Sequence, residues 1–311
     1  MFSWKIINVD FMRWRKVGLV LSTLINLAAI GSLATQGLNL SIEFTGGTVV
    51  ELAYETPPSL DDIRSRLAGS DFGAGVVQNF GGPENVLVRL PPVEAVGGAE
   101  AAGKDVGARM QKLLPEAEIR RVEFVGPQVG EELAEEGVIA ALIAMGGILL
   151  YVMLRFTLKF SLGSITATVH DVLVIMGFFS ITRLEFDLNA LAAVLAIMGY
   201  SLNDTIVILD RIRENFRTMR KAEPVTVVNA SLNQTLSRTI NTSLLTLLAV
   251  LALLFFGGEM IHGFALALTI GIVVGVYSSI YIAGAMVLAL GATREELLPI
   301  QKEGAALDDR P

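Results

Sequence analysis

One carboxylate in this sequence stands where an ionised side chain is costly. Asp204 lies within the apolar run 188–209, inside the segment GYSLNDTIVILDRIREN (199–215). An ionised carboxylate in a bilayer costs ~2.5–3.5 kcal/mol on insertion scales, so it is usually paired, protonated or turned toward a cavity. An acid at this position indicates either a proton or ion relay, or a structural polar contact between helices.

The next apolar run supplies a candidate partner for this acid. The segment NQTLSRTINTSLLTLL (233–248) carries Arg238 near its start. Three threonines fall on nearly the same helical face: Thr235, Thr242 and Thr246. Because a guanidinium stays protonated, Asp204 would be the titrating member of a pair with Arg238. We expect the hydroxyls to line a hydrated path to this pair, although Arg238 could instead snorkel to the membrane surface.

Other polar side chains in the apolar runs could support such a relay. His170 and Asp171 are adjacent, so they point about 100° apart on a helix and should address different neighbours. Either one could join the relay or form a structural hydrogen bond between helices. Asn203 and Thr205 flank Asp204 directly and complete the set of supporting polar groups.

Several other kinds of chemistry are disfavoured by the residues present. The chain has no cysteine and two histidines, His170 and His262, far apart in sequence, so we expect no metal site. Intramembrane aspartyl proteolysis would need two facing carboxylates, here Asp171 and Asp204, with Gly-x-Gly-Asp around one of them. The run Ser-Leu-Asn-Asp does not fit that pattern. We therefore expect a protein that is not an enzyme and holds no cofactor.

The elements that position these groups are predicted to cross a membrane. The 311 residues are 52% hydrophobic and 18% charged, a composition typical of integral membrane proteins. At roughly 20 residues per span, six runs are long enough: about 17–36, 136–155, 161–181, 188–209, 239–257 and 263–290. The first is too long for a signal peptide and is predicted to be a retained helix.

Small residues predict which helices pack closely. The fourth run has a line of them at helical spacing: Ala192, Ala196, Gly199 and Asn203. This line predicts an inner helix that a neighbour approaches closely. The pair Gly271 and Gly275 in the sixth run likewise predicts a close-packing face.

Basic residues in alternate connections predict the orientation. They cluster in the N-terminal segment, in the connection after the second run and after the fourth run, which the positive-inside rule places in the cytoplasm. Both ends, 1–16 and 291–311, and a loop near 210–238 are then cytoplasmic. The polar region 37–135 is then extracytoplasmic.

That polar region shows its own order of elements. Alternating segments at 48–56, 75–81, 85–92 and 118–127 predict strands. Segments 59–69, with Ser59 as N-cap, and 99–115 predict helices. The order β-α-β-β-α-β predicts a small ferredoxin-like α+β domain. It contains no catalytic motif, so we interpret it as a docking or handling module.

Four motifs, in this order, resemble those of a known family. They are IEFTGGTVVE (42–51), GYSLNDTIVILDRIREN, NQTLSRTINTSLLTLL and FALALTIGIVVGVYSSIYIA (264–283). The chain is similar over nearly its whole length to the SecF branch of the SecD/SecF family, bacterial protein-export membrane proteins of the resistance-nodulation-division superfamily. The first motif opens the extracytoplasmic domain of that family, here as Glu43, Phe44, Thr45, Gly46 and Gly47. Glu43 stands where the family often has aspartate.

The resemblance implies a function in the bacterial cytoplasmic (inner) membrane. A SecD subunit, the SecYEG translocon and an unfolded preprotein are the implied partners, and the proton motive force is the implied energy source. The family's aspartate and arginine fall on Asp204 and Arg238. The alternatives are a passive scaffold for SecD and the SecY channel or, less favoured because the extracytoplasmic domain is small, small-molecule efflux. No nucleic-acid partner is expected.

Overall fold

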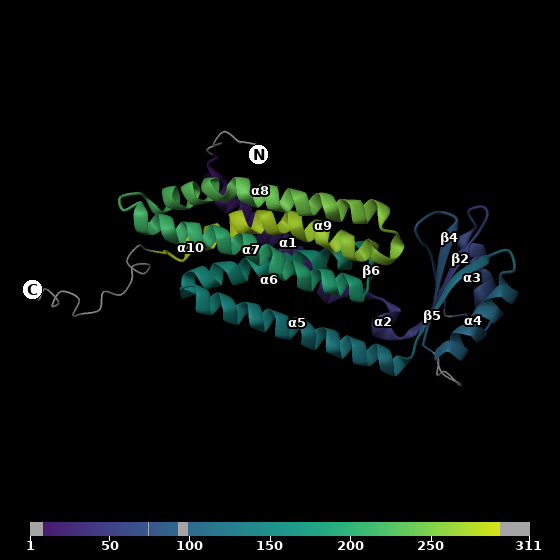
Figure 1. Ribbon diagram of the computed structural model, residues 1–311. Coiled ribbons are helices and arrows are strands. Elements are labelled where there is room, and N and C mark those ends of the chain that lie inside the picture. The colour runs from purple at the N-terminus through teal and green to yellow at the C-terminus, as the bar shows by residue number, and fades with distance from the viewer. Residues whose placement is uncertain (1–8, 74, 93–98, 293–311) are drawn as a thin grey trace, which may run out of the picture.

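The computed structural model describes residues 9–73, 75–92 and 99–292 (Figure 1). Long helices form one body, and a small domain of strands and short helices lies beyond one end of it (Figure 1). Most of the predicted tail, 293–311, and residues 1–8 of the predicted N-terminal segment lie outside the described residues.

Six segments of the described chain are long and apolar enough to cross a membrane, as predicted. The first five are α1 (Arg15–Gln36), α5 (Pro127–Arg155), α6 (Leu158–Thr182), α7 (Leu188–Thr218) and α8 (Pro224–Phe256). The first of these is preceded by the turn η1 (Phe11–Trp14). The sixth is α9 (His262–Ser278), which continues through η3 (Ser279–Ala283) into α10 (Gly284–Ala289). A 3-10 turn, η2 (Glu259–Ile261), precedes α9. The chain is therefore a multi-pass membrane protein, and we call these helices the membrane body.

The predicted loop at 210–238 is wrong, because α7 and α8 both extend into it. Its polar residues stabilise helix instead of loop. Arg211 pairs with Glu214 at 2.9 Å one turn along α7, a spacing that supports helix beyond the apolar stretch. Asn215 donates to the Ser231 hydroxyl at 2.9 Å and so fastens α7 to α8.

The small domain contains the predicted order of strands and helices. It comprises β2 (Gly47–Ala53), α3 (Leu60–Ala68), β3 (Val76–Asn79), β4 (Asn85–Leu90), α4 (Ala99–Leu113) and β5 (Glu118–Val125). Ser59 caps α3 as predicted, since its hydroxyl accepts from the Asp62 N–H at 3.4 Å. The sheet is antiparallel in the order β3-β4-β2-β5. Its core, which includes Leu52, Val88 and Met110, joins the sheet to the two helices.

Two short parallel strands join the small domain to the membrane body. β1 (Asn39–Leu40) leaves α1 and pairs with β6 (Glu185–Phe186), which connects α6 to α7. The four-residue helix α2 (Ile42–Thr45) follows β1 and packs on α5. The chain then enters β2 directly.

Two glycines are required where α2 passes into β2. Gly46 and Gly47 have φ values of 69° and 128°, a region that disfavours other residues. A Cβ on Gly46 would lie 2.9 Å from Pro127 Cα, and one on Gly47 would lie 2.6 Å from the Leu90 carbonyl oxygen. The glycines therefore let the chain turn while it touches both α5 and β4.

The two sets of small residues that were predicted to pack closely have different surroundings in the membrane body. A Cβ on Gly271 would lie 2.5 Å from Ile197, and one on Gly275 would lie 3.0 Å from the Ser201 hydroxyl. The predicted close-packing face of α9 is therefore confirmed, with α7 as its neighbour. The line from Ala192 to Asn203 on α7 is exposed instead. The close approach of a neighbouring helix to this line stays a prediction, because α9 packs on the opposite face of α7.

Candidate functional site

Asp204 is buried between α7 and α8. Its side chain is 5% exposed, and its Oδ2 accepts a hydrogen bond from the Ser243 hydroxyl at 3.1 Å. Among the described residues Asp204 bonds to Ser243 and forms no ion pair with Arg238, the predicted partner. Arg238 lies five positions before Ser243, about 140° around the helix. It is therefore on the exposed side of α8.

The predicted threonine path on α8 stays a prediction. Thr242 and Thr246 donate to carbonyl oxygens of their own helix, each at 3.0 Å, and do not reach Asp204. Thr235 lies on the buried face and bonds to the Ser231 carbonyl at 3.0 Å. Ser243, which the sequence reasoning missed, continues the buried line from Thr235 and Thr239 at helical spacing.

A second buried carboxylate has more partners. Asp171 on α6 is 1% exposed. Its Oδ1 lies 3.0 Å from His170 Nδ1, and its Oδ2 accepts from the hydroxyls of Ser201 at 2.5 Å and Ser278 at 2.9 Å. The carboxylate therefore connects α6, α7 and α9. Beyond their mutual contact the two side chains have different neighbours, because Asp171 reaches Ser201 and Ser278 while the His170 ring lies 6.2 Å from that of Tyr277.

The π-helical turn η3 completes this polar cluster. Ser279 at its start shares a hydrogen bond of 2.8 Å with Thr205, the residue after Asp204. Consecutive serines, Ser278 and Ser279, thus contact Asp171 and α7. Asn203, the other predicted supporting group, is exposed and lies outside the cluster. Single turns of π-helix are frequent at functional sites.

The two acids do not form a catalytic dyad. In the part of the chain that the structure describes, Asp171 and Asp204 share no hydrogen-bonding partner and do not bond to each other. An aspartyl protease requires two carboxyl groups that share one proton. The geometry therefore gives that hypothesis no support.

The motif at 43–47 places its acid, Glu43, at the N-terminal end of α7. Glu43 Oε2 accepts a hydrogen bond from the backbone N–H of Leu188, the first residue of α7, at 2.7 Å. Phe44 is buried against Phe186, with ring centroids 6.3 Å apart. Thr45 donates to the Ser41 carbonyl at 3.0 Å. The motif thus fixes the start of the small domain on the membrane body.

An ion pair makes a further contact at this junction. Arg89 of β4 lies 2.5 Å from the Glu185 carboxylate of β6 and donates to the Leu40 carbonyl at 2.9 Å. Burial raises the pKa of the Glu185 carboxyl, and Arg89 opposes this effect. Arg89 therefore ties a central strand of the small domain to both strands of the β1–β6 pair.

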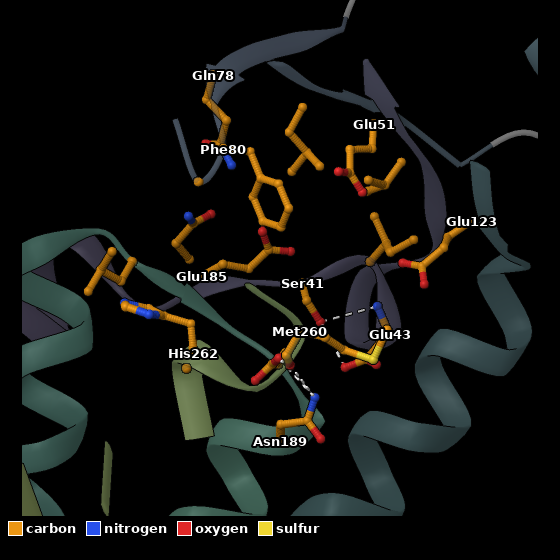
Figure 2. A pocket seen from close by; sticks show the side chains of 18 of the residues that line it. Ser41, Glu43, Glu51, Gln78, Phe80, Glu123, Glu185, Asn189, Met260 and His262 are labelled. Atoms are coloured by element: carbon orange, nitrogen blue, oxygen red, sulfur yellow. Dashed lines mark hydrogen bonds between the residues drawn. The ribbon is translucent and has the colours of Figure 1, made fainter. Parts of the chain in front are cut away.

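A cavity of about 530 Å³ lies beside the junction. Figure 2 shows Gln78 and Phe80 of the small domain on one side, with Asn189 and His262 of the membrane body on the other. Carboxylates are frequent in its lining: Glu43, Glu51, Glu123, Glu185 and Asp187. No group of three or more metal-ligating side chains gathers anywhere in the described residues. The small domain is thus attached at the junction and separated from the membrane body beside it.

Two family models match this chain. The model described as protein export membrane protein SecD/SecF, C-terminal, matches residues 105–293. The model described as the SecD/SecF GG motif matches residues 31–58, which contain Gly46 and Gly47.

Curated relatives match nearly the whole chain. The protein translocase subunit SecF of Vibrio alginolyticus is 48% identical over 98% of this chain and 97% of its own length. The subunit of the same name from Pseudomonas aeruginosa is 48% identical over 99% of each chain. A crystal structure of SecDF, a translocon-associated membrane protein from Thermus thermophilus, is 39% identical with a TM-score of 0.84. The match covers 93% of this chain and 40% of that longer one.

Proposed function

This chain belongs to the SecD/SecF family of protein-export membrane proteins, and we propose that it acts as the SecF subunit of a SecDF complex. In this role it assists Sec-dependent translocation of unfolded preproteins through the SecYEG channel of the bacterial inner membrane, driven by the proton motive force. The observation that carries the coupling proposal is the buried Asp204 carboxylate, which accepts one hydrogen bond from the described part of the chain.

The proposed orientation places both ends of the chain in the cytoplasm. It is supported by the basic residues at the end of the membrane body away from the small domain, where Arg155 pairs with Asp210 at 2.5 Å. The region 37–135 then lies outside the membrane. We propose that its β2–β5 sheet with α3 and α4 is a ferredoxin-like domain, a proposal supported by its strand order and antiparallel pairing.

We propose that Asp204 alternates between its protonated and ionised forms. The Arg238 charge favours the ionised form and burial opposes it, so a small movement of α8 against α7 changes the balance. Protonation removes the charge that Arg238 attracts and lets the two helices repack. One elementary charge that crosses 100 mV supplies about 2.3 kcal/mol, which biases a two-state element without moving it fully to one side.

The SecD subunit is proposed to cover the exposed faces of α7 and α8. Gly199 has open space around it, and Arg238 is exposed on the neighbouring helix. A guanidinium within a bilayer needs a polar partner, and small residues allow a second helix to approach. A partner on this surface would complete the environment of Arg238.

The coupling proposal is tested with Asp204→Asn in the assembled SecDF complex. We expect the variant to assemble with SecD and to lose the export that depends on the proton motive force, measured as preprotein uptake into membrane vesicles. Asp210→Asn is the matched control, since Asp210 lies on the same helix but pairs with Arg155. Normal export by Asp204→Asn would contradict the proposal and favour the passive scaffold.

A further inference from the structure

The helix that carries Asp204 begins against a residue from the small domain's entrance. Glu43 of α2 accepts the N–H of Leu188 at 2.7 Å. The first N–H groups of a helix lack partners within the helix, and they give its start a partial positive charge. A carboxylate is therefore well suited to hold α7 by its end.

A second carboxylate caps the same helix without linking it to another element. Asp187 directly precedes α7, and its Oδ1 accepts from the Ala190 N–H at 2.7 Å. Both acids thus satisfy the same helix end. Asp187 belongs to the connection that leads into α7, whereas Glu43 belongs to the segment that leads into β2. Glu43 alone therefore combines capping with a connection between the two parts of the molecule.

α7 is one continuous helix from its capped end through Asp204 to Thr218. At 1.5 Å per residue, about 24 Å separates Leu188 from Asp204 along its axis. A continuous helix shifts as a unit, so a displacement at Asp204 also displaces the N–H group that Glu43 holds.

The residues that follow Glu43 in the chain transmit such a displacement to the sheet. Gly46 and Gly47 lead directly from α2 into β2, and their close approach to Pro127 and Leu90 leaves little freedom at that turn. β2 is a central strand of the sheet, between β4 and β5. Glu43 also lines the cavity shown in Figure 2, which leaves space beside the junction into which the domain can move.

We infer that Glu43 is the positioning residue that links α7 to the small domain, so that a change at Asp204 alters where that domain lies. This inference rests on the proposed function, because it requires Asp204 to change state during the cycle. It assigns the acid of the motif at 43–47 a role in transmission.

The test measures the position of the small domain in the assembled SecDF complex. Because this chain has no cysteine, cysteines at Val76 and Ile181, both exposed, can carry one spin label on each part. The distance between the labels is compared with and without Asp204→Asn. We expect Asp204→Asn to shift the distance distribution when Glu43 is present, and to shift it much less with Glu43→Ala.

Two further variants separate transmission from helix capping. Glu43→Asp keeps the charge, so we expect it to restore much of the shift. Asp187→Ala removes a cap from the same helix end, so we expect it to lower thermal stability about as much as Glu43→Ala while the full shift remains. Export should fall about fivefold in Glu43→Ala, which corresponds to about 1 kcal/mol of lost coupling between α7 and the small domain, and should change much less in Asp187→Ala.

The outcomes distinguish this inference from the proposed function. An equal shift with and without Glu43 would overturn the inference, as would an equal loss of the shift in Asp187→Ala. Absence of any shift on Asp204→Asn with Glu43 intact would overturn it as well. Normal export by Asp204→Asn would instead contradict the proposed function, whatever distance the spin labels give.

Discussion

Asp171 and Asp204 carry the same carboxylate and are almost equally buried, but their surroundings differ. Their exposed fractions are 1% and 5%. Among the residues that the structure describes, Asp171 has three hydrogen-bond partners, from α6, α7 and α9, whereas Asp204 has one, from α8. Hydrogen bonds to a charged group contribute about 1.5–3 kcal/mol each. A change of state at Asp171 would therefore disturb several helix contacts at once, and one at Asp204 would disturb a single contact.

The comparison teaches that the number of hydrogen-bond partners, more than burial, separates a buried acid with a fixed position from one that can change its protonation state. The three partners of Asp171 hold its carboxylate in place and make it a structural centre of the membrane body. Asp204 lies between two helices with one hydroxyl and a distant guanidinium, so its environment depends on how α7 and α8 are spaced. We therefore assign Asp171 a role in the stability of the membrane body and Asp204 a role in proton coupling.

The largest effect on stability is expected at Asp171. Asp171→Ala removes the acceptor of the Ser201 and Ser278 hydroxyls and the partner of His170, and each buried polar group left unpaired costs about 1–3 kcal/mol. Asp204→Ala removes one hydrogen bond and should cost about 1–2 kcal/mol. Denaturant unfolding of the two variants in detergent measures the difference. Equal losses would break the distinction between a fixed and a switchable acid.

A smaller effect should follow the loss of the single donor to Asp204. Ser243→Ala is expected to destabilise the chain by about 1 kcal/mol and to lower export, because the Asp204 carboxylate loses its hydrogen bond. Thr242→Ala is the control, since that exposed hydroxyl bonds to its own helix, and it should change stability by less than about 0.5 kcal/mol. If Thr242→Ala reduces export more than Ser243→Ala, the predicted threonine path is favoured over the observed contact.

The smallest effect concerns Glu185, a third carboxylate, outside the membrane body's helices. Its pKa is raised above the ordinary value by burial, so the folded chain binds this proton more tightly than the unfolded chain does. Its contribution to stability is present below the unfolded pKa and is lost as the pH rises through the folded pKa. Between about pH 4 and pH 7, wild type should therefore lose more thermal stability than Glu185→Gln. Parallel pH profiles would show that Arg89 fully offsets the cost of burying the charge.

Much of the fold follows from local patterns in the sequence. The six spans and the strands and helices of the small domain depend on apolar runs and alternation within each segment, so they were predicted closely. The segment 210–238 was predicted wrongly, because polar composition does not distinguish a loop from a helix that extends into water. Contacts between the two helices, such as that of Asn215 with Ser231, hold the segment helical, and composition does not reveal them.

The site could be predicted only in part. The depth of Asp204 in its apolar run singles it out without any structure. Its contact with Ser243, and the bonds from Ser201 and Ser278 to Asp171, depend on how helices far apart in sequence are rotated against one another. Serines are common in apolar helices, so their types alone carry little signal. The helical line of Thr235, Thr239 and Ser243 was the available clue.

The π-helical turn η3 has a consequence for how chains of this kind can change in length. Such a turn accommodates one more residue than an α-helical turn, and each added residue rotates the following helix by about 100°. At the end of this turn, the Ala283 carbonyl approaches the α6 backbone so closely that a Cβ on Gly163 would lie 3.1 Å away. Deletion of one of the residues 279–282 would convert the turn to regular α-helix and rotate Ala283 away from α6. Relatives that lack this turn should therefore differ here by a one-residue gap with compensating changes on α6, and single substitutions alone should not convert one form into the other.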